Sequence, residues 1–155
     1  TDCREVPHDF HARYSCKGKT YVYRICDAKV RDPFNTRFTA YHRGRLDADR
    51  MNAAAAAFLG THDFSAFCAS GSSVEDKVRT VSEAKVERVG DEVRFTVTAD
   101  GFLYNMVRIM AGTLLDVSLG LIDSAGMSDI IESRNREKAG RTAPARGLTL
   151  EKVSY

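Results

Sequence analysis

Arg108 is the residue whose type and surroundings point most directly to chemistry. It lies in residues 101–115, a run that is typical of a buried helix. Apolar side chains recur there at helical spacing and form one stripe: Leu103, Met106, Val107, Met110, Leu114 and Val117. A guanidinium keeps its proton, so beside a core it needs a carboxylate, a phosphate or several carbonyl groups as partners. No acidic residue of this helix stands at a suitable spacing, so we expect the partner of Arg108 to come from elsewhere.

A cluster of cations among aromatic residues, residues 10–24, is a candidate for binding RNA. Its cationic members are His11, Arg13, Lys17, Lys19 and Arg24. Cations neutralise phosphates and aromatic rings stack on bases, so this mixture suits contact with RNA. An amphipathic pair of strands with a solvated basic face explains the same pattern equally well.

Two further basic segments are weaker candidates. Arg79 in residues 77–80 suits the phosphate-contacting rim of a site, although an exposed strand start is the favoured interpretation. Arg141 lies in the basic loop 134–148. The default interpretation is a solvated surface loop, and the alternative is a loop that lines a substrate site. The sequence holds no G-x-S-x-G, P-loop or G-x-G-x-x-G motif. His11, His42 and His62 lack a partner at a useful spacing, which favours surface or capping roles.

Strands and helices alternate along the chain that positions these residues. Residues 19–26 predict a strand with Tyr21, Tyr23 and Ile25 on one face and Val22 and Arg24 on the other. A second extended segment is expected over residues 10–16, with Lys17 and Gly18 as the turn between the two. Further strands are predicted at 78–89, 92–99 and 148–155, the first two as a hairpin around Gly90 and Asp91.

Helices fill the intervals between these strands. One is expected from the N-cap Asp47 to Gly60, and Asp63 opens a short helical turn that extends to residue 67. The Arg108 helix should end near Gly120, and a shorter helix over 128–133 has Ser128 as its candidate N-cap. This order predicts an α+β fold, a mainly antiparallel sheet with helices packed on one face, over a single domain of residues 1–155.

Composition limits the class of protein. The chain has 155 residues, 43% of them hydrophobic and 28% charged, as in a folded domain. Its net charge of +2 is too small to indicate nucleic-acid binding without local clustering. The cysteines are scattered without a C-x-x-C pair, which suits reduced thiols in the cytoplasm better than disulfides or a zinc site. No apolar run reaches the roughly 18 residues that span a bilayer, and no signal peptide is recognised.

Five separated motifs together resemble the tRNA pseudouridine synthase A family, in the order in which they occur there. They are residues 9–13 with 17–25, 46–54, 60–67, 101–114 and 139–155. The resemblance implies that the uridine N-glycosidic bond is broken, the base is turned, and it is rejoined through carbon. It implies that Tyr21 stacks on the target base and takes part in proton removal. Arg108 matches the arginine that pairs with the family's nucleophilic aspartate. Leu148 matches an apolar residue that lines the uridine pocket.

The same resemblance implies the partners. The substrate would be the anticodon arm of tRNA with its target nucleotide flipped out of the stack, and the basic clusters would hold the RNA backbone. It also implies a cytoplasmic homodimer with one tRNA bridging both subunits, and no metal or organic cofactor.

The family's nucleophilic aspartate does not occur in this sequence. It belongs to a G-R-T-D-x-G-V-H-type segment, whereas Arg141 and Thr142 are followed here by Ala143. We therefore expect the chain to be the C-terminal half of such an enzyme, inactive by itself unless a local carboxylate such as Asp63 substitutes. The alternatives are a non-catalytic RNA-binding or dimerisation module and an unrelated small α+β enzyme.

Overall fold

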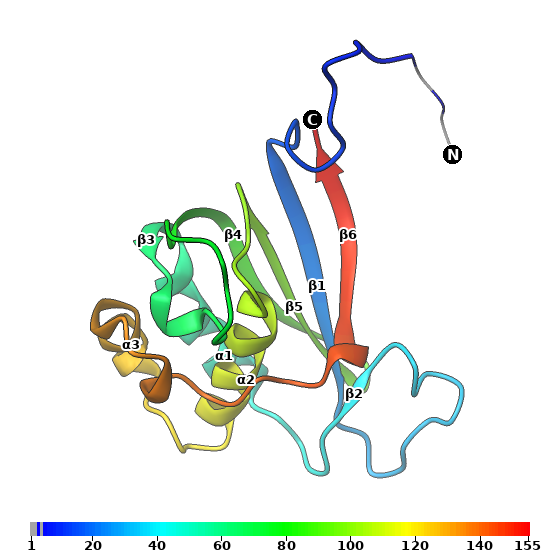
Figure 1. Ribbon diagram of the computed structural model, residues 1–155. Coiled ribbons are helices and arrows are strands. Elements are labelled where there is room, and N and C mark those ends of the chain that lie inside the picture. Colours follow the sequence, from blue (N-terminus) through cyan, green and yellow to red (C-terminus); the bar gives the residue numbers. More distant parts are fainter. Residues whose placement is uncertain (1–2, 4) are drawn as a thin grey trace.

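A six-stranded sheet with its helices on one face organises the chain (Figure 1). The computed structural model describes Cys3 and residues 5–155. The strands are β1 (Gly18–Cys26), β2 (Ala40–Tyr41), β3 (Gly60–Asp63), β4 (Val78–Val89), β5 (Glu92–Ala99) and β6 (Leu148–Ser154). The helices are α1 (Ala48–Ala55), α2 (Met106–Ser118) and α3 (Met127–Ser133), with short 3-10 turns at Ala56–Phe58, Ser65–Phe67, Ser124–Gly126, Arg136–Lys138 and Ala145–Gly147. The predicted α+β class is confirmed.

Strand β1 has partners along both of its edges. One of its edges pairs with β5 along Lys19–Cys26, and the other pairs with β6 and then, in parallel, with the short β2. Tyr21 lies opposite Val97 of β5 and Leu150 of β6. Because side chains alternate along a strand, Tyr21 and Tyr23 face the helices while Arg24 faces the other way.

Helix α2 is buried on nearly its whole circumference, not only along the predicted stripe. Ile109, Ala111 and Thr113 are buried together with the stripe residues. The sheet covers one side of α2, and the segment 139–143 covers another, where a Cβ on Gly112 would lie 1.8 Å from the carbonyl oxygen of Arg141. The glycine is what allows the two backbones to touch.

Residues 10–16 form turns, so the prediction of an extended segment there is wrong. The Nδ1 atom of His11 accepts hydrogen bonds from the backbone N–H groups of Arg13, at 3.1 Å, and Tyr14, at 3.3 Å. The N–H of Ser15 also donates to the carbonyl of His11, at 2.8 Å. These local bonds replace the partners that a strand would need, since β5, β6 and β2 already occupy both edges of β1.

Several predicted helix limits are also corrected. Helix α2 begins only at Met106, because Asn105 has a left-handed backbone (φ 58°) that a right-handed helix cannot continue. Helix α1 ends at Ala55 and tightens into a 3-10 turn, so that Gly60 opens β3 instead of ending a helix. Asp63 belongs to β3, with the helical turn confined to Ser65–Phe67, and α2 stops at Ser118. Helix α3 begins after Gly126, one residue before the expected cap Ser128.

Candidate active site

Tyr21, Arg108 and Leu148 line one cleft. It lies between β1, β6 and the start of α2, and its other walls come from Phe102, Leu103, Asn105, Met106 and Val107. Its volume of about 160 Å³ is below the roughly 300–1,000 Å³ of pockets that enclose a small molecule. A cleft of this size does not enclose a small-molecule ligand by itself.

The guanidinium of Arg108 is held by neutral groups. Its Nε donates to the carbonyl of Ala143, at 2.7 Å, and its Nη1 donates to Oδ1 of Asn105, at 2.9 Å. The N–H of Ala143 donates back to the carbonyl of Arg108, at 3.0 Å. Within the described part of the chain, no carboxylate forms an ion pair with Arg108. A half-buried, oriented cation that lacks a counter-charge is suited to bind an anion.

Asn105 is a site residue that the sequence reasoning did not single out. It occupies the N-cap position of α2, where an asparagine side chain ordinarily accepts a hydrogen bond from the helix backbone. Here the side chain makes no capping bond and instead accepts from Arg108. An asparagine directly before a helix was the available indication, because Asn tolerates the left-handed backbone better than most residues.

Tyr23 supports the loop that holds Arg108. Its ring is fully buried and its hydroxyl donates to the carbonyl of Pro144, at 2.7 Å. Burial raises the pKa of Tyr23 to about 12, against the lowering effect of the nearby positive charges of Arg108 and Arg146. The hydroxyl therefore stays protonated at neutral pH and remains a donor to the backbone next to Ala143.

Tyr21 is the more accessible of the two tyrosines that face the helices. It is half-buried, and its ring meets that of Phe102 edge to face, with centroids 5.1 Å apart and planes at 89°. Such an edge-to-face contact with Phe102 holds the plane of the Tyr21 ring in one orientation. A ring held in this way beside an aliphatic residue, Leu148, is suited to sandwich a flat base.

Some of the predicted RNA-binding residues lie near this cleft. Arg13 lines a neighbouring groove of about 380 Å³ that shares Phe102, Leu103 and Asn105 with the first cleft. The ring of His11 packs against that of Tyr14 in the same turn region as Arg13. Lys17 is exposed just before β1, and the alternation of β1 puts Lys19 on the face of Tyr21.

The other predicted RNA-binding residues are placed differently. Arg24 lies on the sheet face opposite to Tyr21, and its Nε atom is buried without a hydrogen-bond partner among Cys3 and residues 5–155. Arg141 is bound to the carboxylate of Asp116, with Nη2 2.5 Å from Oδ1. The Nη1 of Arg79 donates to the carbonyl oxygens of Asp76 and Val78. The structure thus gives Arg79 and Arg141 partners from the chain itself.

The local carboxylate considered as a substitute nucleophile, Asp63, does not line the cleft. Its Oδ1 accepts from the N–H and the hydroxyl of Ser65, and its Oδ2 lies 3.2 Å from Nε of Arg134. Burial alone would raise the pKa of Asp63, but these partners together hold it below its usual value. Across Cys3 and residues 5–155, no three His, Cys, Asp or Glu side chains gather as a metal site would require, and no helix is long and apolar enough to cross a membrane.

Comparison with known proteins gives consistent matches. A family model described as tRNA pseudouridine synthase matches residues 54–155. The tRNA pseudouridine synthase A of Acetivibrio thermocellus is 49% identical over 154 residues, which cover 99% of this chain and 63% of that protein. Its counterpart in Halalkalibacterium halodurans is 48% identical over 147 residues, covering 95% and 56% respectively. The counterpart in Staphylococcus aureus strain MRSA252 is 43% identical over 148 residues, covering 96% and 56%. The chain thus spans only 56–63% of the length of these relatives.

Proposed function

Because this chain belongs to the tRNA pseudouridine synthase family, we propose that it supplies the base-stacking and charge-pairing half of a uridine-isomerising site. The observation that carries the proposal is the meeting of Tyr21, Arg108 and Leu148 in one cleft. These residues come from β1, α2 and the start of β6, so their proximity depends on the tertiary fold.

The nucleophile in this proposal is an aspartate from a part of the protein outside this chain. Arg108 would pair with that carboxylate, keep its pKa low, and so keep it ionised for attack. The contacts from Asn105 and Ala143 would hold the guanidinium in place before the carboxylate arrives. After the N-glycosidic bond is broken, Tyr21 and Leu148 would confine the detached base while it turns. A carbon of the base would then bond to the ribose in place of the nitrogen; the proton that this carbon loses would be removed with the help of Tyr21, and the nitrogen would gain a proton, so that the product is an isomer of uridine.

We extend the proposal to the whole protein in four respects. This chain is the C-terminal domain of a cytoplasmic homodimer, and its substrate is the anticodon arm of tRNA. Its basic residues hold the RNA backbone, and a separate N-terminal domain carries the nucleophilic aspartate. The isolated chain then forms no pseudouridine. A non-catalytic RNA-binding or dimerisation module is the second candidate, favoured by the lack of an ion-paired carboxylate at Arg108 in the described residues.

The test is pseudouridine formation in tRNA by the full-length protein and its Tyr21→Phe variant. We expect the wild type to convert uridine in the anticodon arm. The variant should bind tRNA with similar affinity, because the phenyl ring still stacks, but turn over much more slowly. Wild-type turnover by Tyr21→Phe would refute its assigned role, and an inactive wild type that still binds tRNA would favour the non-catalytic module.

A further inference from the structure

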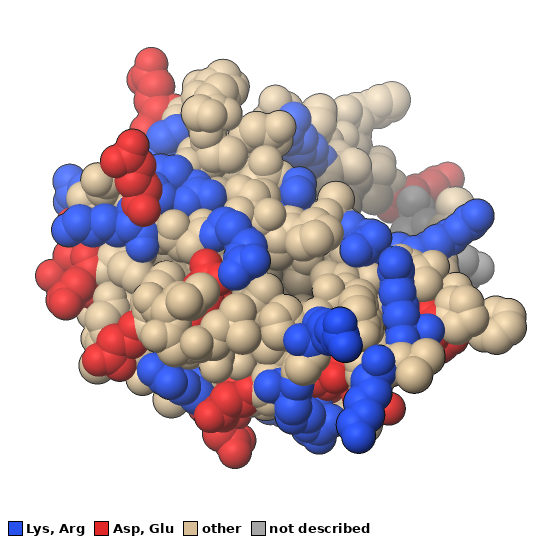
Figure 2. Space-filling view, turned by 90° about the horizontal axis from the view of Figure 1, so that it is seen from below, with Lys and Arg blue, Asp and Glu red and all other residues tan. Residues whose placement is uncertain are grey.

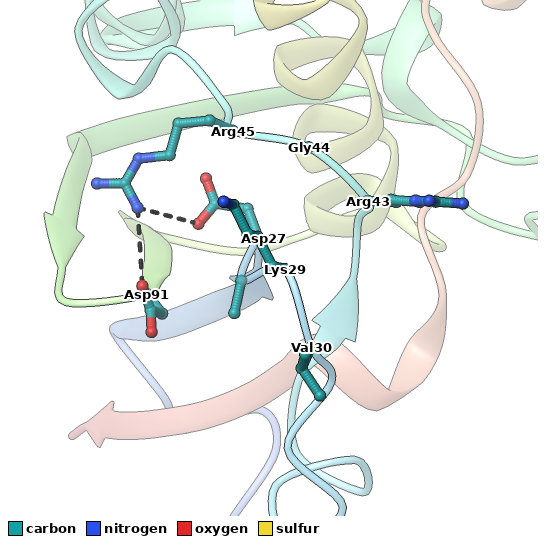
Figure 3. Close-up of a pocket in the computed structure, with 8 residues that line it drawn as sticks. Asp27, Lys29, Val30, Arg43, Gly44, Arg45 and Asp91 are labelled. Atoms are coloured by element: carbon teal, nitrogen blue, oxygen red, sulfur yellow. Dashed lines mark ion pairs between the residues drawn. The ribbon is translucent and has the colours of Figure 1, made fainter.

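A second and wider cleft opens where β1 runs into the loop before β2 (Figure 3). Its volume is about 860 Å³. We name it the β1-end cleft, and its lining residues are Asp27, Ala28, Lys29, Val30, Arg43, Gly44, Arg45 and Asp91. It shares no residue with the cleft that holds Tyr21 and Arg108.

The buried acid at the base of this cleft is neutralised from within the protein. Asp27 accepts two hydrogen bonds from Arg88, at 3.0 and 2.8 Å, and one from the N–H of Leu46, at 2.8 Å. Burial alone would raise the pKa of Asp27, but these partners hold it below its ordinary value. The charge of Asp27 is thus already neutralised by Arg88. Asp27 therefore does little to neutralise the cations at the rim of the cleft.

Three cations, Lys29, Arg43 and Arg45, stand at the rim, and among the described residues only Arg45 lies within ion-pair distance of a carboxylate. Arg45 is 60% exposed in its side chain, and its Nη1 lies 3.7 Å from Asp27 and 3.8 Å from Asp91, too far for hydrogen bonds (Figure 3). Lys29 and Arg43 are exposed and make no side-chain hydrogen bond or ion pair in the described part of the chain. The cleft is lined by two carboxylates, Asp27, which is already bonded to Arg88, and the exposed Asp91, so its three cations outnumber the one carboxylate that remains and the rim is positive.

The loop between β1 and β2, which leads from Lys29 towards Arg43, carries exposed aromatic side chains. Phe34 is 89% exposed and Phe38 61% exposed in the same loop, with Arg31 and Arg37 beside them in the sequence. Figure 2 views the molecule from the end that carries this loop and shows Lys and Arg side chains standing out from its surface. Because cations neutralise phosphates and exposed aromatic rings stack on bases, the rim cations and the rings of this loop are suited to contact RNA.

We propose that the β1-end cleft is a second RNA-binding site, which holds the phosphate backbone of the substrate away from the reacting uridine. Asp27 directly follows β1 and is six positions beyond Tyr21, so alternation puts both on the same face, and the six steps measure roughly 20 Å at about 3.3 Å per residue. An RNA with its target base at Tyr21 therefore reaches the cleft only if it extends several nucleotides beyond that base. This inference rests on the proposed tRNA substrate.

The test measures how tRNA affinity depends on salt, using the full-length protein. Each phosphate contact contributes about 0.7–0.9 to the slope of log K against log salt. Lys29→Gln and Arg43→Gln should each make the slope shallower by about that amount, and the double variant by about twice as much. Arg43→Lys should retain the wild-type slope because it retains the charge. Lys85→Gln is the matched control, since it removes one exposed cation that is already paired with Glu87, and it should leave the slope unchanged.

Kinetics separate a remote binding site from a catalytic one. The double variant should show a raised KM for tRNA with an unchanged kcat, and an unchanged KM for an RNA too short to extend 20 Å from the target uridine. A wild-type salt slope and KM in the double variant would overturn the proposal and favour an acidic protein as the occupant of the cleft. Binding is measured independently of turnover, so failure of the wild type to make pseudouridine would count against the proposed function and not against this site.

Discussion

Replacing Asn105 by glycine should lower activity while leaving the fold nearly intact. Asn105 has φ 58° and ψ 12°, a conformation that glycine adopts without steric penalty, so Asn105→Gly removes the side-chain amide and keeps the backbone. The lost interaction is the 2.9 Å hydrogen bond from Nη1 of Arg108. Hydrogen bonds to charged groups contribute about 1.5–3 kcal/mol, which corresponds to roughly a tenfold to hundredfold fall in kcat/KM if the full effect appears in the transition state.

Asn105→Ala is the comparison that separates positioning from stability. Alanine also lacks the amide, but its Cβ makes the left-handed conformation unfavourable by about 1–2 kcal/mol. Both variants should lose activity to a similar extent, whereas the alanine variant should unfold at a lower urea concentration than the glycine variant. The assays are single-turnover pseudouridine formation by the full-length protein and urea unfolding. Activity of Asn105→Gly within about twofold of wild type would show that the Ala143 carbonyl suffices to position Arg108.

Two further predictions concern stability. Gly112→Ala would bring a Cβ to 1.8 Å from the carbonyl oxygen of Arg141, so we expect urea titration to show a loss of about 3 kcal/mol or more in unfolding free energy. Gly126→Ala is the control: no atom lies within 4 Å of its new Cβ, so its unfolding free energy should be close to that of the wild type. Burial would raise the pKa of Asp27, but the hydrogen bonds from Arg88 outweigh it and lower the pKa. The ionised carboxylate therefore stabilises the fold at pH values above the ordinary aspartate pKa. Asp27→Asn should therefore be less stable than wild type at pH 7, with the difference shrinking as the pH falls below about 4; a difference independent of pH would contradict this linkage.

Local patterns in the sequence were sufficient to predict the main elements. The alternation in β1 and in the β4–β5 hairpin and the helical spacing of the α2 stripe depend on near neighbours, and all three elements are present, although α2 begins later than predicted. The prediction of a strand over residues 10–16 failed because the His11 side chain accepts hydrogen bonds from nearby backbone N–H groups, which competes with strand formation. The start of α2 was predicted too early because Asn105 adopts a left-handed backbone (φ 58°), which interrupts the helix although the apolar spacing continues before it.

The site depends on contacts that sequence spacing does not encode. The resemblance supplied Tyr21, Arg108 and Leu148, but the pairing of Arg108 with Ala143 requires the segment 139–143 to lie on α2. The rim of the β1-end cleft was missed because Lys29 and Arg43 are separated in the sequence by a long loop. They approach the same cleft only because β2 returns alongside the end of β1.

The most direct test of the account is single-turnover pseudouridine formation in tRNA by the full-length protein with Arg108→Ala. Removing the group proposed to orient and ionise the nucleophilic carboxylate should slow the reaction by at least about 100-fold, as does loss of a comparable electrostatic contact in other active sites. Affinity for tRNA should change little, because Arg108 is one half-buried cation among many exposed ones. A rate within about twofold of wild type would contradict the central claim that this chain contributes the cationic half of the site.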